Sequence, residues 1–108
     1  MFKKNNVKSI RINEIHKQIE LNSKITVCQF EELLNLNFEI IFQYDGKTYE
    51  VIQNGMFIEL HNDCFYENGK TKSVSFSKYL SSKEFMENAE IQGKSFVEVI
   101  SQIKILHC

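Results

Sequence analysis

The stretch 38–60 contains two hairpin signals, and they constrain the fold more than any other feature of the sequence. Asp45-Gly46 and Asn54-Gly55 are dipeptides that type I′ turns favour, because both central residues of such a turn take a positive φ angle. β-branched and aromatic residues flank both dipeptides, as is typical of strands. The sequence therefore predicts a meander of three antiparallel strands joined by two tight turns.

The two turns also predict how the strands align. Loops formed by the two dipeptides pair Phe42 with Tyr49 and Val51 with Ile58, and they place Glu50 opposite Glu59. Because side chains alternate between the two faces of a strand, one face of the meander becomes apolar. We expect it to comprise Phe38, Ile40, Phe42, Tyr49, Val51, Met56, Ile58 and Leu60.

The other face of the meander is mixed in character. Its polar members are predicted to be Glu39, Gln43, Thr48, Glu50, Glu59 and His61, and its apolar members Ile41, Ile52 and Phe57. Two interpretations of the apolar members stay open. Either a terminal segment covers them, or they form an exposed patch that binds a partner.

Helices are predicted on both sides of the meander. Apolar residues follow helical spacing over 12–21, although alternation at 10–12 also allows a short strand there. Three capping boxes, in which a Ser or Thr and a Glu or Gln exchange hydrogen bonds with each other's backbone, mark further helix starts. They pair Thr26 with Gln29, Ser81 with Glu84, and Ser95 with Glu98.

The region between the meander and these later helices carries a third turn signal, Asn68-Gly69. Residues 61–72 are therefore expected to be a small hairpin or a loop. Residues 73–77 alternate and predict a fourth strand, with Val74 and Phe76 facing the core. The predicted fold class is α+β, a three- to four-stranded antiparallel meander with N- and C-terminal helices packed on one face.

Length and composition indicate one globular domain over 1–108, with 1–8 as a flexible tail. The chain has 108 residues, of which 43% are hydrophobic and 25% charged, as is typical of such domains. No apolar run reaches the roughly 18 residues of a membrane span, and the basic N-terminus lacks the apolar segment of a signal peptide. Cys28, Cys64 and Cys108 are odd in number and widely spaced, which predicts reduced thiols and a cytoplasmic protein.

Charge is unevenly distributed along the chain. Residues 25–68 contain one lysine and eight acidic residues, a net charge of −7, whereas 1–24 and 69–108 carry +4 and +2. The meander is therefore expected to present an acidic face, which disfavours nucleic acid and suits a basic protein partner.

Searches for catalytic and cofactor motifs give little. Three Gly-Lys-Ser/Thr sequences lack the upstream glycine of a phosphate-binding loop, so no cofactor is predicted. His61 and Cys64 have the spacing of metal ligands, and His107 and Cys108 are further donors. Since no Cys-x-x-Cys pair accompanies them, no metal site and no catalytic residue is predicted.

Part of the chain resembles a class of small uncharacterised bacterial proteins. The likeness rests on the hairpin Y-D-G-K-T-Y-E at 44–50 and on the ending E-F-M-E-N-A-E-I-Q-G-K-S-F-V-E at 84–98, and it covers roughly residues 30–105. The resemblance implies a similar fold and a bacterial cytoplasm, and it implies no catalytic residues.

The sequence thus predicts a small non-enzymatic interaction protein, of inhibitor or immunity type, that binds a basic protein or a second copy of itself. The predicted partner-binding residues are Glu39, Ile41, Glu50, Ile52, Phe57 and Glu59. Two alternatives stay open. One is a small metal- or thiol-dependent enzyme that uses His61 and Cys64, and the other is a nucleic-acid accessory protein that uses the basic N-terminus.

Overall fold

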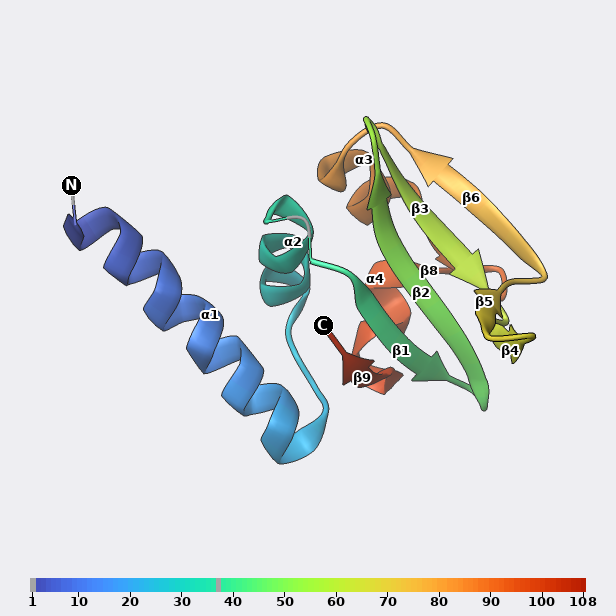
Figure 1. Ribbon diagram of the computed structural model, residues 1–108, viewed down its shortest axis with the longest axis horizontal. Coiled ribbons are helices and arrows are strands. Elements are labelled where there is room, and N and C mark those ends of the chain that lie inside the picture. The colour runs from blue at the N-terminus through green and yellow to red at the C-terminus, as the bar shows by residue number, and fades with distance from the viewer. Residues whose placement is uncertain (1, 37) are drawn as a thin grey trace.

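The computed structural model describes residues 2–36 and 38–108, with side chains described from Ile12 onward. It confirms the predicted α+β class, because helices from both ends of the chain accompany an antiparallel sheet (Figure 1). The helices are α1 (Phe2–Asn22), α2 (Val27–Asn35), α3 (Ser82–Asn88) and α4 (Phe96–Val99), which continues into a 3₁₀ turn, η1 (Ile100–Gln102). The strands are β1 (Ile40–Tyr44), β2 (Lys47–Asn54), β3 (Phe57–Asn62), β4 (Phe65–Glu67), β5 (Lys70–Lys72), β6 (Ser75–Tyr79), β7 (Glu90–Ile91), β8 (Lys94–Ser95) and β9 (Lys104–His107).

The main sheet contains five strands in the order β6-β3-β2-β1-β9, so the predicted three to four strands were too few. The unexpected member is the C-terminal β9, which pairs antiparallel with β1. Only Ile105 is buried among its four residues. A single inward side chain gives too short an alternation to predict a strand from sequence.

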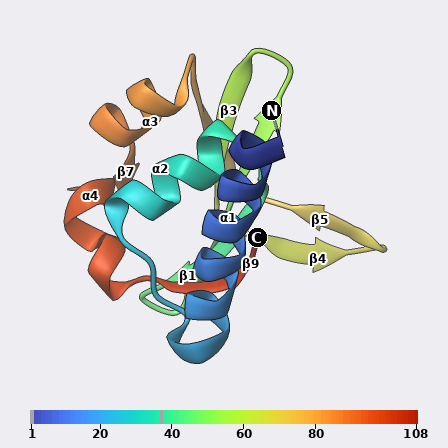
Figure 2. The same ribbon diagram turned by 90° about the vertical axis from the view of Figure 1, so that its left-hand side faces the viewer.

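Two small hairpins lie outside the main sheet. Residues 61–72 include one of them, β4–β5, whose turn residues Asn68 and Gly69 both have positive φ angles, of 52° and 78°. This hairpin projects away from the side of the sheet that carries α2, α3 and α4 (Figure 2). The second, β7–β8, turns at Gln92-Gly93.

The two turns of the meander differ in type. Asp45 and Gly46 both have positive φ angles, of 52° and 76°, and the predicted pairing of Phe42 with Tyr49 is confirmed. In the second turn Asn54 pairs with Phe57, so the loop consists of Gly55 and Met56. Gly55 has a φ of 63°, whereas Asn54 and Met56 stay at negative φ, the pattern of a type II′ turn with glycine in first place.

This turn shifts the alignment of β2 and β3 by two positions from the prediction. Val51 lies opposite Leu60 rather than Ile58. A shift of two preserves the alternation of faces, so the predicted apolar face is buried except at two members. Phe38 is half-buried, and Met56 is 80% exposed in the turn.

The side chains of β6 point opposite to the prediction. Phe76 lies opposite His61 on the face away from the core and is 50% exposed, and Val74 is 69% exposed. Tyr79 is the residue of β6 that faces the core. It lies opposite Ile58, and its ring contacts the Phe85 ring edge-on with centroids 5.2 Å apart. The serines of β6 therefore share the face of Tyr79.

The first helix is longer than expected. α1 begins at Phe2 and runs through both the segment predicted as a tail and the alternative strand at 10–12. Ile15 is buried, and Ile12 and Ile19 pack against the core as half-buried residues, as the helical spacing over 12–21 predicts. Gln18 of α1 exchanges hydrogen bonds of 3.2 and 3.0 Å with Gln29 of α2.

The three predicted capping boxes have different outcomes. The box of Thr26 and Gln29 is confirmed in both directions. At α3, Ser81 accepts a bond from the Glu84 N–H, but Glu84 accepts from the N–H of Leu80 rather than Ser81. Ser95 makes no side-chain cap bond and pairs with Glu90 in the β7–β8 hairpin.

Four phenylalanine rings from different elements meet in the core and are called the aromatic cluster below. They are Phe30 of α2, Phe42 of β1, Phe85 of α3 and Phe96 of α4, each 0% exposed. Their ring centroids lie 4.7 to 6.3 Å apart, in the range of favourable aromatic contacts. The aromatic cluster thus joins the sheet to α2, which precedes it in the chain, and to α3 and α4, which follow β6.

Phe42→Ala is expected to lower the free energy of unfolding by about 3–5 kcal/mol, because it removes a buried ring and leaves a cavity. Phe65→Ala is the matched control, since Phe65 is 44% exposed, and it should cost less than about 1 kcal/mol. Urea denaturation followed by circular dichroism measures both. Equal losses would contradict the central place of Phe42.

Candidate functional site

The face of the main sheet that points away from the aromatic cluster is the candidate functional site and is called the open face. α2, α3 and α4 lie on the other side of the sheet (Figure 2). By strand register, the open face of β1, β2, β3 and β6 comprises Ile41, Gln43, Thr48, Glu50, Ile52, Phe57, Glu59, His61, Phe76 and Lys78.

Two rows of facing side chains cross the open face. The first row consists of Ile41, Glu50, His61 and Phe76, and the second of Ile52, Glu59 and Lys78. The predicted pairing of Glu50 with Glu59 was therefore wrong, because the Gly55-Met56 turn brings His61 opposite Glu50. Glu50 therefore lies opposite His61, and Glu59 lies opposite Lys78.

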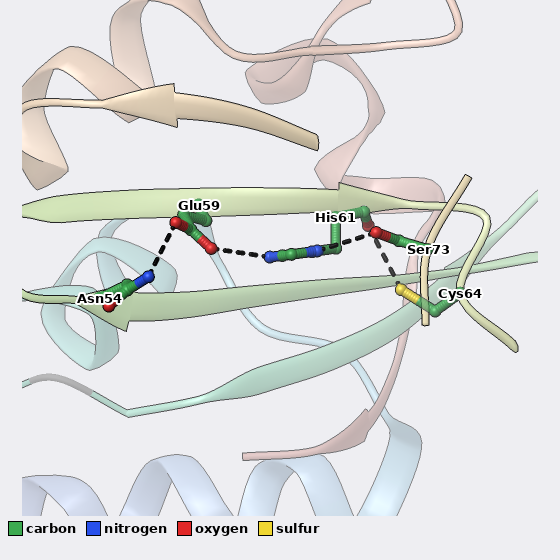
Figure 3. Close-up of polar contacts among 5 residues, drawn as sticks. All are labelled: Asn54, Glu59, His61, Cys64 and Ser73. Carbon is green, nitrogen blue, oxygen red and sulfur yellow. Dashed lines mark hydrogen bonds and ion pairs between the residues drawn. The ribbon is translucent and has the colours of Figure 1, made fainter. Parts of the chain in front are cut away.

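A polar network runs along β3 and out to the loop before β6 (Figure 3). Asn54 Nδ2 donates to Glu59 Oε2 at 3.1 Å, and Glu59 Oε1 lies 2.9 Å from His61 Nε2. On the other side of the imidazole, Nδ1 lies 2.9 Å from Ser73 Oγ. Both ring nitrogens of His61 are thus engaged at full hydrogen-bond distance.

Glu59 is 5% exposed and is the one charged residue in the described core. Its hydrogen bond with His61 holds the pKa of Glu59 below its ordinary value, against burial, which raises it, and the Asn54 bond and the charges of His61 and Lys78 add to the lowering. The carboxylate is therefore ionised at neutral pH and is satisfied within the chain. It acts as an anchor for His61 rather than as a surface group.

Glu50 shows the opposite behaviour. The pKa of Glu50 is raised to about 7, first by burial and then by hydrogen bonding with Glu39 and repulsion by that carboxylate, while the charge of His61 opposes the rise. Glu39 is exposed and Glu50 half-buried. Near neutral pH, two neighbouring carboxyl groups are therefore held together partly by a proton on Glu50.

Cys64 is a poor nucleophile in this setting. The pKa of the Cys64 thiol is raised to about 11, first by burial and then by the charge of Glu50. Its Sγ donates to the backbone carbonyl of His61 at 3.5 Å, so the imidazole is not its partner. A raised pKa leaves little thiolate at neutral pH, which disfavours the thiol-enzyme alternative.

Five of the six predicted partner-binding residues lie on the open face by strand register, and Glu39, just before β1, interacts with Glu50 of that face. The six are not equally exposed. Glu39 is exposed, Phe57 is 37% exposed, and Ile41, Glu50 and Ile52 are half-buried. Glu59 is the exception, because it is covered and bonded internally.

Sequence reasoning missed several residues of this face. The Phe76 ring stacks on His61 at 5.0 Å, and Lys78 Nζ lies 5.2 Å from the centroid of Phe57. Glu59 and His61 are two apart in a strand, which predicts a shared face and was available as a signal. Ser73 was not singled out, because it lies in the loop before β6 and its contact with His61 depends on how that loop is tied to the end of β3.

Other parts of the chain offer less chemistry. A cavity of ≈ 210 Å³ lies beside α1 and α2 and is lined by Glu14, Ile15, Cys28, Gln29 and Glu32. Among the residues whose placement is described, no three His, Cys, Asp or Glu side chains are grouped to hold a metal ion.

Comparisons of the chain with protein-family models, with curated proteins and with solved structures gave no match. Over the residues that the structure covers, the helices include none long and apolar enough to cross a membrane.

Glu50→Gln tests the raised pKa of Glu50 through stability. In the folded protein Glu50 keeps its proton from pH 4.5 up to about 7, where the unfolded chain has lost it, so wild-type stability falls as pH rises through this window. Relative to wild type, the variant should gain on the order of 1 kcal/mol between pH 5 and pH 8, after allowance for solvent screening.

Urea denaturation at the two pH values measures this difference. Glu98→Gln is the matched control, because Glu98 is exposed on α4, and its difference from wild type should not change with pH. A pH-independent difference for Glu50→Gln would show that Glu50 titrates normally.

Proposed function

We propose that this chain is an interaction protein, of inhibitor or immunity type, that binds a basic segment of another protein on the open face of its sheet. The observation that carries this proposal is the pair formed by Glu39 and Glu50. Glu39 raises the pKa of Glu50 both by hydrogen bonding and by repulsion, which is the behaviour of two neighbouring carboxyl groups that need a shared proton or a cation.

A lysine or arginine of a partner supplies the missing positive charge. Placed between the two carboxylates, it replaces the proton on Glu50 and relieves their repulsion, and a guanidinium also matches carboxylate geometry with two parallel bonds. Lys78 does not meet this need within the chain, because its Nζ lies over the Phe57 and Phe76 rings, 5.2 and 5.9 Å from their centroids.

The surroundings of the pair suit a protein interface. Ile41 and Ile52 are half-buried beside the two carboxylates, and Phe57 and Phe76 are 37% and 50% exposed further across the sheet. Aromatic and aliphatic side chains at the centre, with charged groups near them, are typical of protein interfaces. The position of Lys78 over two rings also illustrates how a partner's cation can stack on this face.

The same pair disfavours the other partners considered. In a two-fold dimer through this face, identical patches meet, so the Glu39–Glu50 pairs of two copies repel each other. Phosphates of nucleic acid are repelled for the same reason. A cytoplasmic location is part of the proposal and is supported by the three cysteines, all of which are free.

A peptide titration tests the proposal with a model ligand in place of the partner. Backbone ¹H–¹⁵N NMR spectra are recorded while an arginine- and phenylalanine-containing cationic peptide is added, with a glutamate-containing peptide of equal length as control probe. The cationic peptide should shift resonances of β1, β2 and β3, and binding should tighten from pH 6 to pH 8 as Glu50 loses its proton.

Charge reversal provides the matched variants. Glu39→Lys with Glu50→Lys should weaken binding at least about tenfold, since each lost close charge pair costs on the order of 1 kcal/mol or more, whereas Glu98→Lys on α4 should leave it within about twofold. Equal binding by both variants, or shifts confined to the acidic residues of α1 and α2, would overturn the assignment of this face. Concentration-dependent dimerisation without peptide binding would favour self-association instead.

A further inference from the structure

Three side chains beside the proposed interface form a hydrogen-bonded series that ends in a hydroxyl group (Figure 3). Glu59 Oε1 lies 2.9 Å from His61 Nε2, and His61 Nδ1 lies 2.9 Å from Ser73 Oγ. The second oxygen of Glu59 accepts a bond from Asn54 at 3.1 Å. A carboxylate that is 5% exposed and bonded on both oxygens is held in a single position.

The ionised carboxylate decides which nitrogen of His61 carries the proton. A carboxylate only accepts hydrogen bonds, so the neutral imidazole must donate from Nε2 and keep a lone pair on Nδ1. The hydroxyl of Ser73 is then the donor in its bond to Nδ1. A buried acid thus orients a histidine whose other nitrogen, in this neutral form, accepts a hydrogen bond from a serine.

This division of roles is the one by which serine hydrolases are recognised on unrelated folds. Compared with that template, the two ring nitrogens of His61 exchange places, because the acid meets Nε2 and the serine meets Nδ1. The chemistry is equivalent, since each nitrogen donates in one tautomer and accepts in the other.

The imidazole and the serine are both held in place by neighbours. The Phe76 ring stacks on His61 with centroids 5.0 Å apart and planes 16° apart. The loop that carries Ser73 is tied to the end of β3 by the Val74 N–H, which donates to the Asn62 carbonyl at 3.0 Å. A reactive pair supported in this way loses little freedom when it reacts.

We propose that Ser73 is a nucleophile for acyl transfer, with His61 as its general base and Glu59 as the residue that positions His61. The acyl donor is an ester with an apolar acyl group, because residues close to Ser73 in the sequence have exposed apolar side chains. Val74 and Phe76 are 69% and 50% exposed, and Phe65, which pairs with Lys72 next to Ser73, is 44% exposed.

In the reaction, Ser73 Oγ attacks the carbonyl carbon of the ester while its proton passes to Nδ1 of His61. The bond from that carbon to the leaving alcohol breaks, and the alcohol takes the proton from Nδ1. Water then repeats the sequence, so the acyl group leaves as a carboxylic acid and Ser73 is regenerated. No oxidant, reductant or further reactant is needed.

Covalent labelling tests this activity without any protein partner, so its outcome is separate from that of the binding proposal. Purified protein is treated with an alkyl fluorophosphonate, and with p-nitrophenyl butyrate as ester, and intact-mass and peptide spectra locate the adduct. One adduct on Ser73 is expected. Ser73→Ala should abolish it, whereas Ser75→Ala, a matched change two residues on, should label at the wild-type rate.

Variants of the other two residues test their roles. His61→Gln should slow labelling by about 100-fold or more, as is usual when a general base is lost. In Glu59→Gln the new amide donates to Nε2, so His61 should change to the Nδ1–H tautomer, which the ¹⁵N shifts of its ring report, and labelling should fall while circular dichroism stays unchanged.

The proposal is overturned if wild-type protein gains no adduct, if Ser73→Ala labels as fast as wild type, or if the adduct lies on another residue. An unchanged tautomer in Glu59→Gln, with labelling retained, would remove Glu59 from the positioning role.

Discussion

The packing of Phe42 against Phe30 and Phe96 fixes which side of the sheet is buried, and the rest of the structure depends on that choice. Side chains alternate along a strand, so burial of Phe42 directs its neighbour Ile41 to the open face. Because Ile41 pairs with Glu50, Glu50 with His61, and His61 with Phe76, these three side chains also point to the open face. The polar groups of the open face are thus arranged by the core on the other side, which explains how a carboxyl group with an unfavourable environment persists there.

Much of this arrangement was predictable from the sequence, because alternation depends only on parity. The residues predicted for the apolar face of 38–60 are buried except Phe38 and Met56, even though the alignment of β2 with β3 was wrong by two positions. The turn itself was the source of the error. Asn54-Gly55 favours a type I′ loop, but glycine satisfies the first position of a type II′ loop equally well, and the sequence does not distinguish the two. On the core face the two-residue shift leaves the set of buried side chains unchanged. On the open face it places His61 rather than Glu59 opposite Glu50.

The parts that sequence reasoning missed share a different cause, which is dependence on distant packing. The sequence 73–77 allows two alternations, one with Val74 and Phe76 inward and the other with Ser75 and Ser77 inward, and hydrophobicity favours the first. The structure uses the second because Tyr79 packs on Phe85. The C-terminal residues form β9 because the edge of β1 is free to pair with them. Glu59 and His61 were already predicted to share a face, but Ser73 meets His61 from the loop before β6, and the sequence does not show where that loop lies.

His61 is the residue at which the two proposed roles meet. It lies opposite Glu50 and beside Glu59, and its charge lowers the pKa of both carboxyl groups. When the ring is protonated, it neutralises Glu50 in part, but Nδ1 then has no lone pair for Ser73. A partner's cation placed between Glu39 and Glu50 takes over that neutralisation. The proposed binding on the open face and the proposed reactivity at its edge thus share one residue, because His61 lies opposite Glu50 and is hydrogen-bonded to Ser73.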